Sequence, residues 1–300
     1  MNNNIDRQQA ETLLKRATTA SVSVVIILIG LKSWGYIESG SVALFGTLLD
    51  SVMDTLSSII IFAAVRFSML PADDDHRFGH GKAEAIAGLL QAFVIGATSL
   101  LLLFEVVDKF INPREIVKAD LGIGIIIASI ILTMMLVAYQ RYVTRMTGSV
   151  AIEADGMHYT GDILLNFGVG ISLILGGYYG FIYADPAFGG IACLYLLHSA
   201  YQVFKSSTDM LMDKEMSDEE RANIEKIIHS HTEVVGIHEL RTRRSGLNIF
   251  IQFHMELEVN ISLVDAHIIS DQVEAEIIKT YQNAEVLIHA DPYNDGSSKV

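Results

Sequence analysis

The chain has 300 residues, 51% of them hydrophobic, and a mean hydropathy of +0.38, which is unusual for a soluble protein of this length and typical of a membrane protein. Its formal net charge is -14, and no stripe of Lys and Arg interleaved with aromatic residues is present, so a nucleic-acid binder is excluded. The single cysteine, Cys193, excludes a disulfide framework and a cluster of thiolate metal ligands.

Six apolar runs in the first two thirds of the chain are each close to the roughly 20 residues that a helix needs to cross a bilayer. We therefore predict an α-helical membrane domain over residues 1–212 with six transmembrane helices. The runs cover residues 17–37, 42–68, 83–110, 121–142, 157–178 and 187–203.

The distribution of basic residues predicts the orientation of these helices. Lys and Arg gather at the N-terminus, in the second and fourth loops and after the sixth run, whereas the fifth loop has none. The third loop, with Lys109, Arg114 and Lys118, weakens the contrast. By the positive-inside rule both termini are expected in the cytoplasm.

From Asp213 onward, alternating apolar residues and frequent charges replace continuous apolarity. We predict a cytoplasmic α+β domain over residues 213–300, an open-faced αββαβ sandwich of the metallochaperone type. The sequence SDEE at 217–220 fits a capping box, and Ser245-Gly246 fits a turn between two strands. Its elements are expected at 218–229, 234–242, 248–257, 263–281 and 285–289.

Acidic residues inside the apolar runs are the main functional signal, because a carboxylate in a membrane span is costly and presumed functional. Asp50 and Asp54 are four residues apart, so on a helix they share one face. His158 and Asp162 repeat this spacing in the fifth run. If the two helices face each other, three carboxylates and one imidazole could bind a divalent metal, for which zinc is the first choice.

Other interpretations of these pairs are a polar contact between helices, an intramembrane metalloprotease, and a metal-gated channel or sensor. A zincin protease needs the motif H-E-x-x-H and an open metal position, and the sequence lacks that motif. Four protein ligands would close the coordination shell, which favours a carrier over an enzyme. A channel differs from a carrier in that its flux does not depend on a proton gradient.

The D-xxx-D and H-xxx-D pairs resemble the motifs of the cation diffusion facilitator family. PADDDHRFGHGKAE at 71–84, LRTRRSG at 240–246 and HADP at 289–292 are similar to segments of that family. The resemblance implies a homodimeric antiporter of the cell inner membrane that exports zinc, and also cadmium or iron(II), in exchange for protons. It assigns the transport site to Asp50, Asp54, His158 and Asp162.

A second cluster lies in the loop after the second run, where Asp73, His76 and His80 have spacings compatible with a metal site. Acids and histidines in a loop are also common on a solvated surface, and Asp74 or Asp75 could replace Asp73 as a ligand. The family resemblance implies a peripheral zinc site at these positions.

The tail contains a third cluster, of four histidines and one aspartate. These residues come from several predicted elements, which favours a shared metal site over four unrelated polar histidines. The resemblance implies a binuclear zinc site, with Asp291 bridging one metal held by two of the histidines and another held by the other two. The expected ligands are His238 and His254, His267 and His289, and Asp291.

Overall fold

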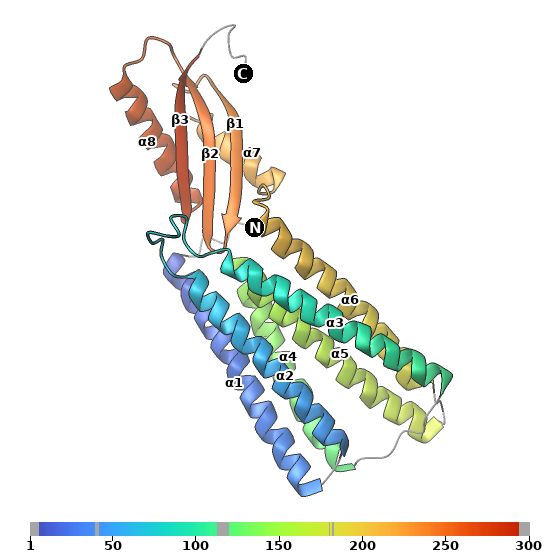
Figure 1. Cartoon of the computed structure of the whole chain (residues 1–300). Coiled ribbons are helices and arrows are strands. Elements are labelled where there is room, and N and C mark those ends of the chain that lie inside the picture. The colour runs from blue at the N-terminus through green and yellow to red at the C-terminus, as the bar shows by residue number, and fades with distance from the viewer. Residues whose placement is uncertain (1–5, 40–41, 113–119, 180, 182, 294–300) are drawn as a thin grey trace. The chain divides into compact units, whose positions relative to one another are not determined.

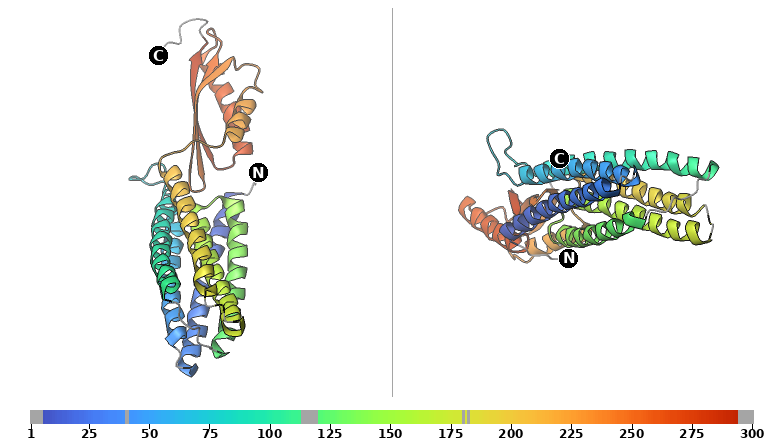
Figure 2. Two further views of the ribbon diagram at one scale, coloured as in Figure 1. Left: turned by 90° about the vertical axis from the view of Figure 1, so that its right-hand side faces the viewer. Right: turned by 90° about the horizontal axis from the view of Figure 1, so that it is seen from below.

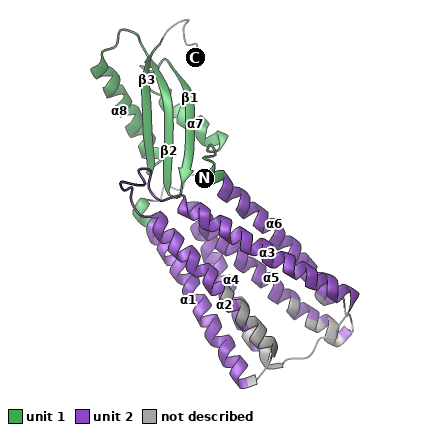
Figure 3. Cartoon of the chain, in the orientation of Figure 1, with its two compact units in different colours: residues 1–10, 209–300 green, residues 11–208 purple. Residues whose placement is uncertain are grey.

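The computed structural model describes the whole chain except residues 1–5, 40–41, 113–119, 180, 182 and 294–300. It divides into two compact units, which Figure 3 shows in different colours. One unit contains residues 11–208, and the other contains residues 1–10 and 209–300. The predicted boundary between residues 212 and 213 stays a prediction.

The larger unit is a bundle of long helices that lie alongside one another (Figures 1 and 2). Each predicted apolar run falls within one helix, and most helices extend beyond their run because helical hydrogen bonding continues into the flanking polar residues. In the described part of the chain they are α1 (Arg7–Ser39), α2 (Val42–Ser68), α3 (Ala83–Ile111), α4 (Asp120–Thr147), α5 (Val150–Tyr179) and α6 (Ala184–Leu211).

The described residues include four segments that are long and apolar enough to cross a membrane: Arg7–Glu38, Ala83–Ile111, Ile127–Thr147 and Pro186–Leu211. These segments make the protein a multi-pass membrane protein. That α2 and α5 are further spans, which would make six, stays a prediction.

Helix α5 packs against α2, α3 and α4, so residues on several of its faces are buried. A small residue also allows α5 to approach α6, since a Cβ atom at Gly161 would clash with the side chain of Leu196 on α6. Close packing of helices through small residues is common in membrane bundles. The residues of α5 that precede and follow Gly161 are thereby held among the other helices.

The smaller unit contains the predicted αββαβ order. Its elements are α7 (Asp218–Ile228), β1 (Gly236–Ser245), β2 (Asn248–Leu257), α8 (Leu263–Thr280) and β3 (Ala284–Pro292). The sheet order is β1-β2-β3, with β1 antiparallel and β3 parallel to β2. Gly246, at a φ of 59°, turns the chain between β1 and β2. This left-handed conformation suits glycine.

Both helices of this unit cover one face of the sheet, where their apolar residues form a core with alternate residues of β2. Ile224 of α7 and Val273 of α8 are fully buried there, with Ile251, Phe253 and Met255 of β2 at 2% exposure or less. Because side chains alternate along a strand, His254 and Glu256 point to the opposite, helix-free face. The strand register therefore decides which polar residues meet on that face.

Helix α7 begins with the predicted capping box. The backbone N–H of Glu220 donates to the Ser217 hydroxyl, and the Glu220 carboxylate accepts from the backbone N–H of Ser217. The Arg244 guanidinium also donates to this carboxylate at 2.6 Å. Partial burial raises the pKa of Glu220, but the charge of Arg244 and the bonds from Ser217 outweigh it and leave the pKa below its ordinary value of 4.5.

We predict that Glu220→Gln lowers the opening free energy of α7 by about 1 kcal/mol at neutral pH. The reason is that a carboxyl group whose pKa is lowered by folding stabilises the fold at pH values above its ordinary pKa. The difference should shrink as the pH falls through the lowered pKa. Amide hydrogen exchange of residues 218–228 measures it. Glu219→Gln, at an exposed position of the same turn, is the control, and equal effects of both variants would contradict the prediction.

Candidate metal centres

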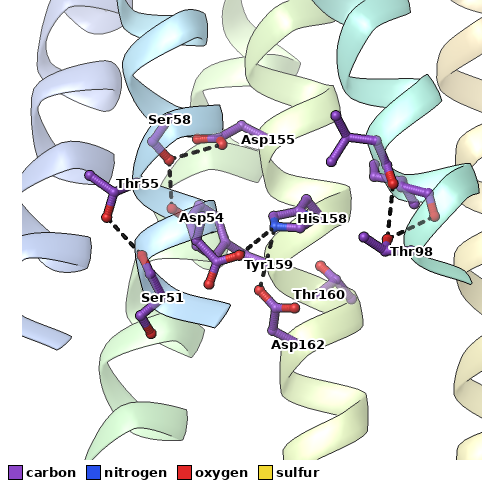
Figure 4. A network of polar contacts seen from close by, with 12 residues as sticks. Ser51, Asp54, Thr55, Ser58, Thr98, Asp155, His158, Tyr159, Thr160 and Asp162 are labelled. Atoms are coloured by element: carbon purple, nitrogen blue, oxygen red, sulfur yellow. Dashed lines mark hydrogen bonds and ion pairs between the residues drawn. The ribbon is translucent and has the colours of Figure 1, made fainter. Parts of the chain in front are cut away.

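A group of three titratable residues lies where α2 faces α5 (Figure 4). Nε2 of His158 on α5 lies 3.0 Å from Oδ1 of Asp54 on α2 and 3.9 Å from Oδ2 of Asp162. One ligand atom from each of the three residues lies within 4.8 Å of the others. His158 is buried, and both carboxylates are partly buried.

Helical spacing explains this arrangement. His158 and Asp162 are four residues apart on α5 and share a face, and that face is directed at Asp54 of α2. Asp50 lies one turn before Asp54 in α2, but its side chain is outside the described residues. The structure thus brings together three of the four predicted ligands, two from one helix and one from another.

The donor set fits a divalent metal. Imidazole suits zinc and other transition metals, and carboxylate oxygens add negative charge and accept several metals of this class. Two carboxylates and one imidazole leave room for a fourth ligand in a tetrahedral shell. The residues in this group can therefore supply three ligands to a divalent ion.

A second buried acid, Asp155, lies one helical turn before His158 on α5 and is 1% exposed. Its Oδ2 accepts hydrogen bonds from Ser21 of α1 at 2.7 Å and Gln140 of α4 at 2.6 Å. Ser58 of α2 donates to Oδ1 at 3.4 Å and also bonds the Tyr159 hydroxyl at 2.6 Å. Asp155 thus joins four helices beside the candidate ion site. The sequence analysis missed it, although it is a charged residue three positions before His158.

The loop cluster is also assembled. Oδ2 of Asp73 lies 3.3 Å from Nε2 of His80, and Oδ1 lies 3.2 Å from Nδ1 of His76. The Nδ1 of His80 faces the Pro71 carbonyl at 3.2 Å, so it carries the proton and leaves Nε2 as the acceptor that can bind metal. The backbone N–H of His76 lowers the pKa of Asp73 and keeps it ionised.

Of the acids that could replace Asp73, Asp74 pairs with Arg77 at 2.8 Å instead of approaching the histidines. The backbone N–H of Asp75 donates to Asp73. Both contacts favour Asp73 as the ligand.

On the helix-free face of the sheet, His238, His254 and His289 form one row across the three strands. Asp291 lies beside all three, at 2.7 Å from Nδ1 of His254, 3.1 Å from Nε2 of His289 and 3.4 Å from Nε2 of His238. The hydrogen bond from His254 lowers the pKa of Asp291, and the nearby histidines add to this effect. One carboxylate shared by three imidazoles is a donor set that fits zinc.

His267, the fifth expected tail residue, is placed differently. It lies on α8, its side chain is exposed, and its Nδ1 is 3.6 Å from Asp271 of the same helix. The structure does not bring it to Asp291 within this chain.

Glu256, which the sequence analysis overlooked, lies next to Asp291 in the strand register, and its Oε1 is 3.9 Å from Nε2 of His238. Its position two residues after His254 on one strand was the signal that could have identified it.

The chain matches two family profiles that together cover most of its length. Residues 18–212 match the cation efflux transmembrane domain, and residues 216–293 match the cytoplasmic domain of cation efflux proteins. The chain belongs to the cation efflux family. Members of the cation efflux family are transporters, so the prediction of a transporter instead of an enzyme is confirmed, as is the family resemblance seen in the sequence.

Relatives in the cation efflux family match nearly end to end. The chain is 39% identical over 284 residues to the cation-efflux pump FieF of Shewanella oneidensis, covering 95% of this chain and 96% of that protein. It is 38% identical over 280 residues to FieF of Salmonella arizonae, covering 93% of both.

Among solved structures, the metal-bound C-terminal domain of the CzcD transporter from Thermotoga maritima is 27% identical to the matched part of this cation efflux protein. The match covers 28% of this chain and all of that one, with a TM-score of 0.25. A TM-score of this size does not establish a shared fold.

We predict that Asp155→Ala destabilises the membrane unit by about 3 kcal/mol, because it removes the buried carboxylate that accepts hydrogen bonds from Ser21 and Gln140. The thermal unfolding temperature in detergent measures the loss. Ser21→Ala alone should cost less, and the double variant should cost less than the sum of the two. Additive effects would contradict a shared network.

Proposed function

We propose that the protein is a proton-coupled antiporter that exports divalent metal from the cytoplasm, with zinc as the first substrate and cadmium and iron(II) as further ones. The observation that carries this proposal is the group formed by Asp54, His158 and Asp162 between two helices of a membrane transporter. The intramembrane carboxylates are then ligands for the cargo, which accounts for their cost in an apolar span.

Zinc is proposed first because the group combines imidazole with carboxylates. Iron(II) and cadmium accept the same donors, so the donor set alone does not restrict the substrate to one metal. Asp50, one turn from Asp54, is proposed as the fourth ligand.

Competition between metal and protons supplies the coupling. Metal ligands must be deprotonated, so a divalent ion displaces protons when it binds. His158 is proposed as a proton carrier, because imidazole ordinarily titrates between pH 5 and 8. At cytoplasmic pH metal binds more often, and on a more acidic outer side protons displace it. The inward proton gradient then drives export.

The protein is proposed to be a homodimer in the cell inner membrane. Both termini of each chain are proposed to lie in the cytoplasm. The basic loops support this orientation, and the match of the tail to the family's cytoplasmic domain supports the location of the C-terminus. The tail cluster around Asp291 is proposed as a zinc site that stabilises the assembled protein, and the loop cluster around Asp73 is proposed as a peripheral zinc site. His267, directed away from Asp291 in one chain, stays a proposed ligand of the second tail metal.

We predict that Asp54→Ala reduces zinc flux into proteoliposomes at least tenfold while the protein still purifies as a folded dimer. The reason is that it removes one of the few ligands in the membrane. Internal zinc and pH dyes record metal uptake and proton movement together. Leu56→Ala, at an exposed position of α2, is the matched control.

In the unmodified protein, zinc uptake should be accompanied by opposing proton movement and should saturate with metal. Near-normal flux in Asp54→Ala would contradict the site. Zinc flux without proton movement would favour a channel or uniporter.

For the tail, we predict that zinc raises the unfolding temperature of the cytoplasmic unit and that Asp291→Ala removes most of this rise, because the carboxylate contacts three histidines. His229→Ala, an exposed histidine outside the cluster, is the control. An equal rise in all three proteins would contradict metal binding at Asp291.

A further inference from the structure

A lysine lies within the first apolar helix, close to the candidate ion site. The ammonium group of Lys32 on α1 donates a hydrogen bond to Oγ of Ser51 on α2 at 2.7 Å, and Ser51 is 1% exposed. Lys32 belongs to the membrane-spanning segment Arg7–Glu38. An ionisable side chain at such a position is costly and is presumed to have a function.

The bond to Ser51 fixes where this positive charge lies. Ser51 and Asp54 are three residues apart on α2, so they occupy neighbouring positions on one face, with Cβ atoms about 5–6 Å apart. Figure 4 shows Ser51 one turn from Asp54, whose carboxylate contacts His158. The ammonium is therefore held about one helical turn from the ligands of the candidate ion.

We infer that Lys32 is a fixed counter-charge of the ion site that weakens metal binding and so speeds metal release. This inference rests on the proposed function. When the site is empty, the ammonium offsets part of the negative charge of the carboxylates. When a divalent ion binds, the same ammonium repels it. A transporter needs this balance, because a site that binds its cargo too tightly releases it slowly.

The size of the effect can be bounded from Coulomb's law. An ion at Asp54 would lie on the order of 7 Å from the ammonium. Even with the screening of bulk water, repulsion between a single and a double positive charge at this distance corresponds to roughly a tenfold loss of affinity. In a less polar surrounding the effect is larger.

The test is zinc binding to the purified full-length protein in detergent, measured by competition with a fluorescent chelator. The component of binding that Asp54→Ala removes is the membrane site. Lys32→Met should raise the zinc affinity of this component at least about tenfold. Lys32→Arg, which keeps the charge, should leave the affinity unchanged. Lys15→Met, in the same helix but paired with Glu11, is the matched control and should have no effect.

Transport provides a second readout that a structural role alone would not produce. In proteoliposomes Lys32→Met should lower KM for zinc and also lower kcat, because binding is tighter and release is slower. Lys32→Gln keeps an N–H donor for Ser51 without the charge, so it gives the same comparison if the Met variant does not fold.

Unchanged zinc affinity in both neutral variants, with the Asp54-dependent component present, would overturn the role of Lys32. If Asp54→Ala removes no component of binding, the proposed function fails instead. The two failures are therefore distinguishable.

Discussion

The contact between His158 of α5 and Asp54 of α2 is the interaction on which the account of this protein depends. It joins two helices that are far apart in the sequence, and it brings an imidazole and a carboxylate to 3.0 Å in a membrane bundle. A buried polar pair of this kind contributes little net stability, because desolvation opposes its attraction. Its position in a membrane bundle is consistent with the proposed binding of a metal ion.

The surrounding helices hold this contact in place through hydrogen bonds between buried polar groups. Asp155 accepts hydrogen bonds from α1, α2 and α4 one turn away from His158, so a shift of α5 would break several bonds at once. Lys32 and Ser51 connect α1 to α2 on the other side of Asp54. These contacts form a polar path along α2 and α5. Any movement of α5 relative to the other helices must preserve or exchange these bonds.

Much of the candidate site could be predicted from the sequence because it depends on local spacing. The four-residue interval between His158 and Asp162 places them on one face of any helix, and α2 spans the predicted run. Partners of Asp155 and Lys32 could not be predicted, since they come from other helices and depend on how the bundle packs. In the tail, alternation predicted β2, but only the register brings Asp291 beside His238 and Glu256. The exposed position of His267 likewise follows from the packing of α8.

The most direct test of the central claim is to locate the metal itself, by anomalous X-ray scattering at the zinc edge from crystals of the zinc-loaded protein. The account predicts an anomalous peak within bonding distance of Nε2 of His158 and the carboxylates of Asp54 and Asp162, and its loss in crystals of Asp54→Ala. Peaks confined to the loop and tail clusters, with none between α2 and α5 in the unmodified protein, would contradict it.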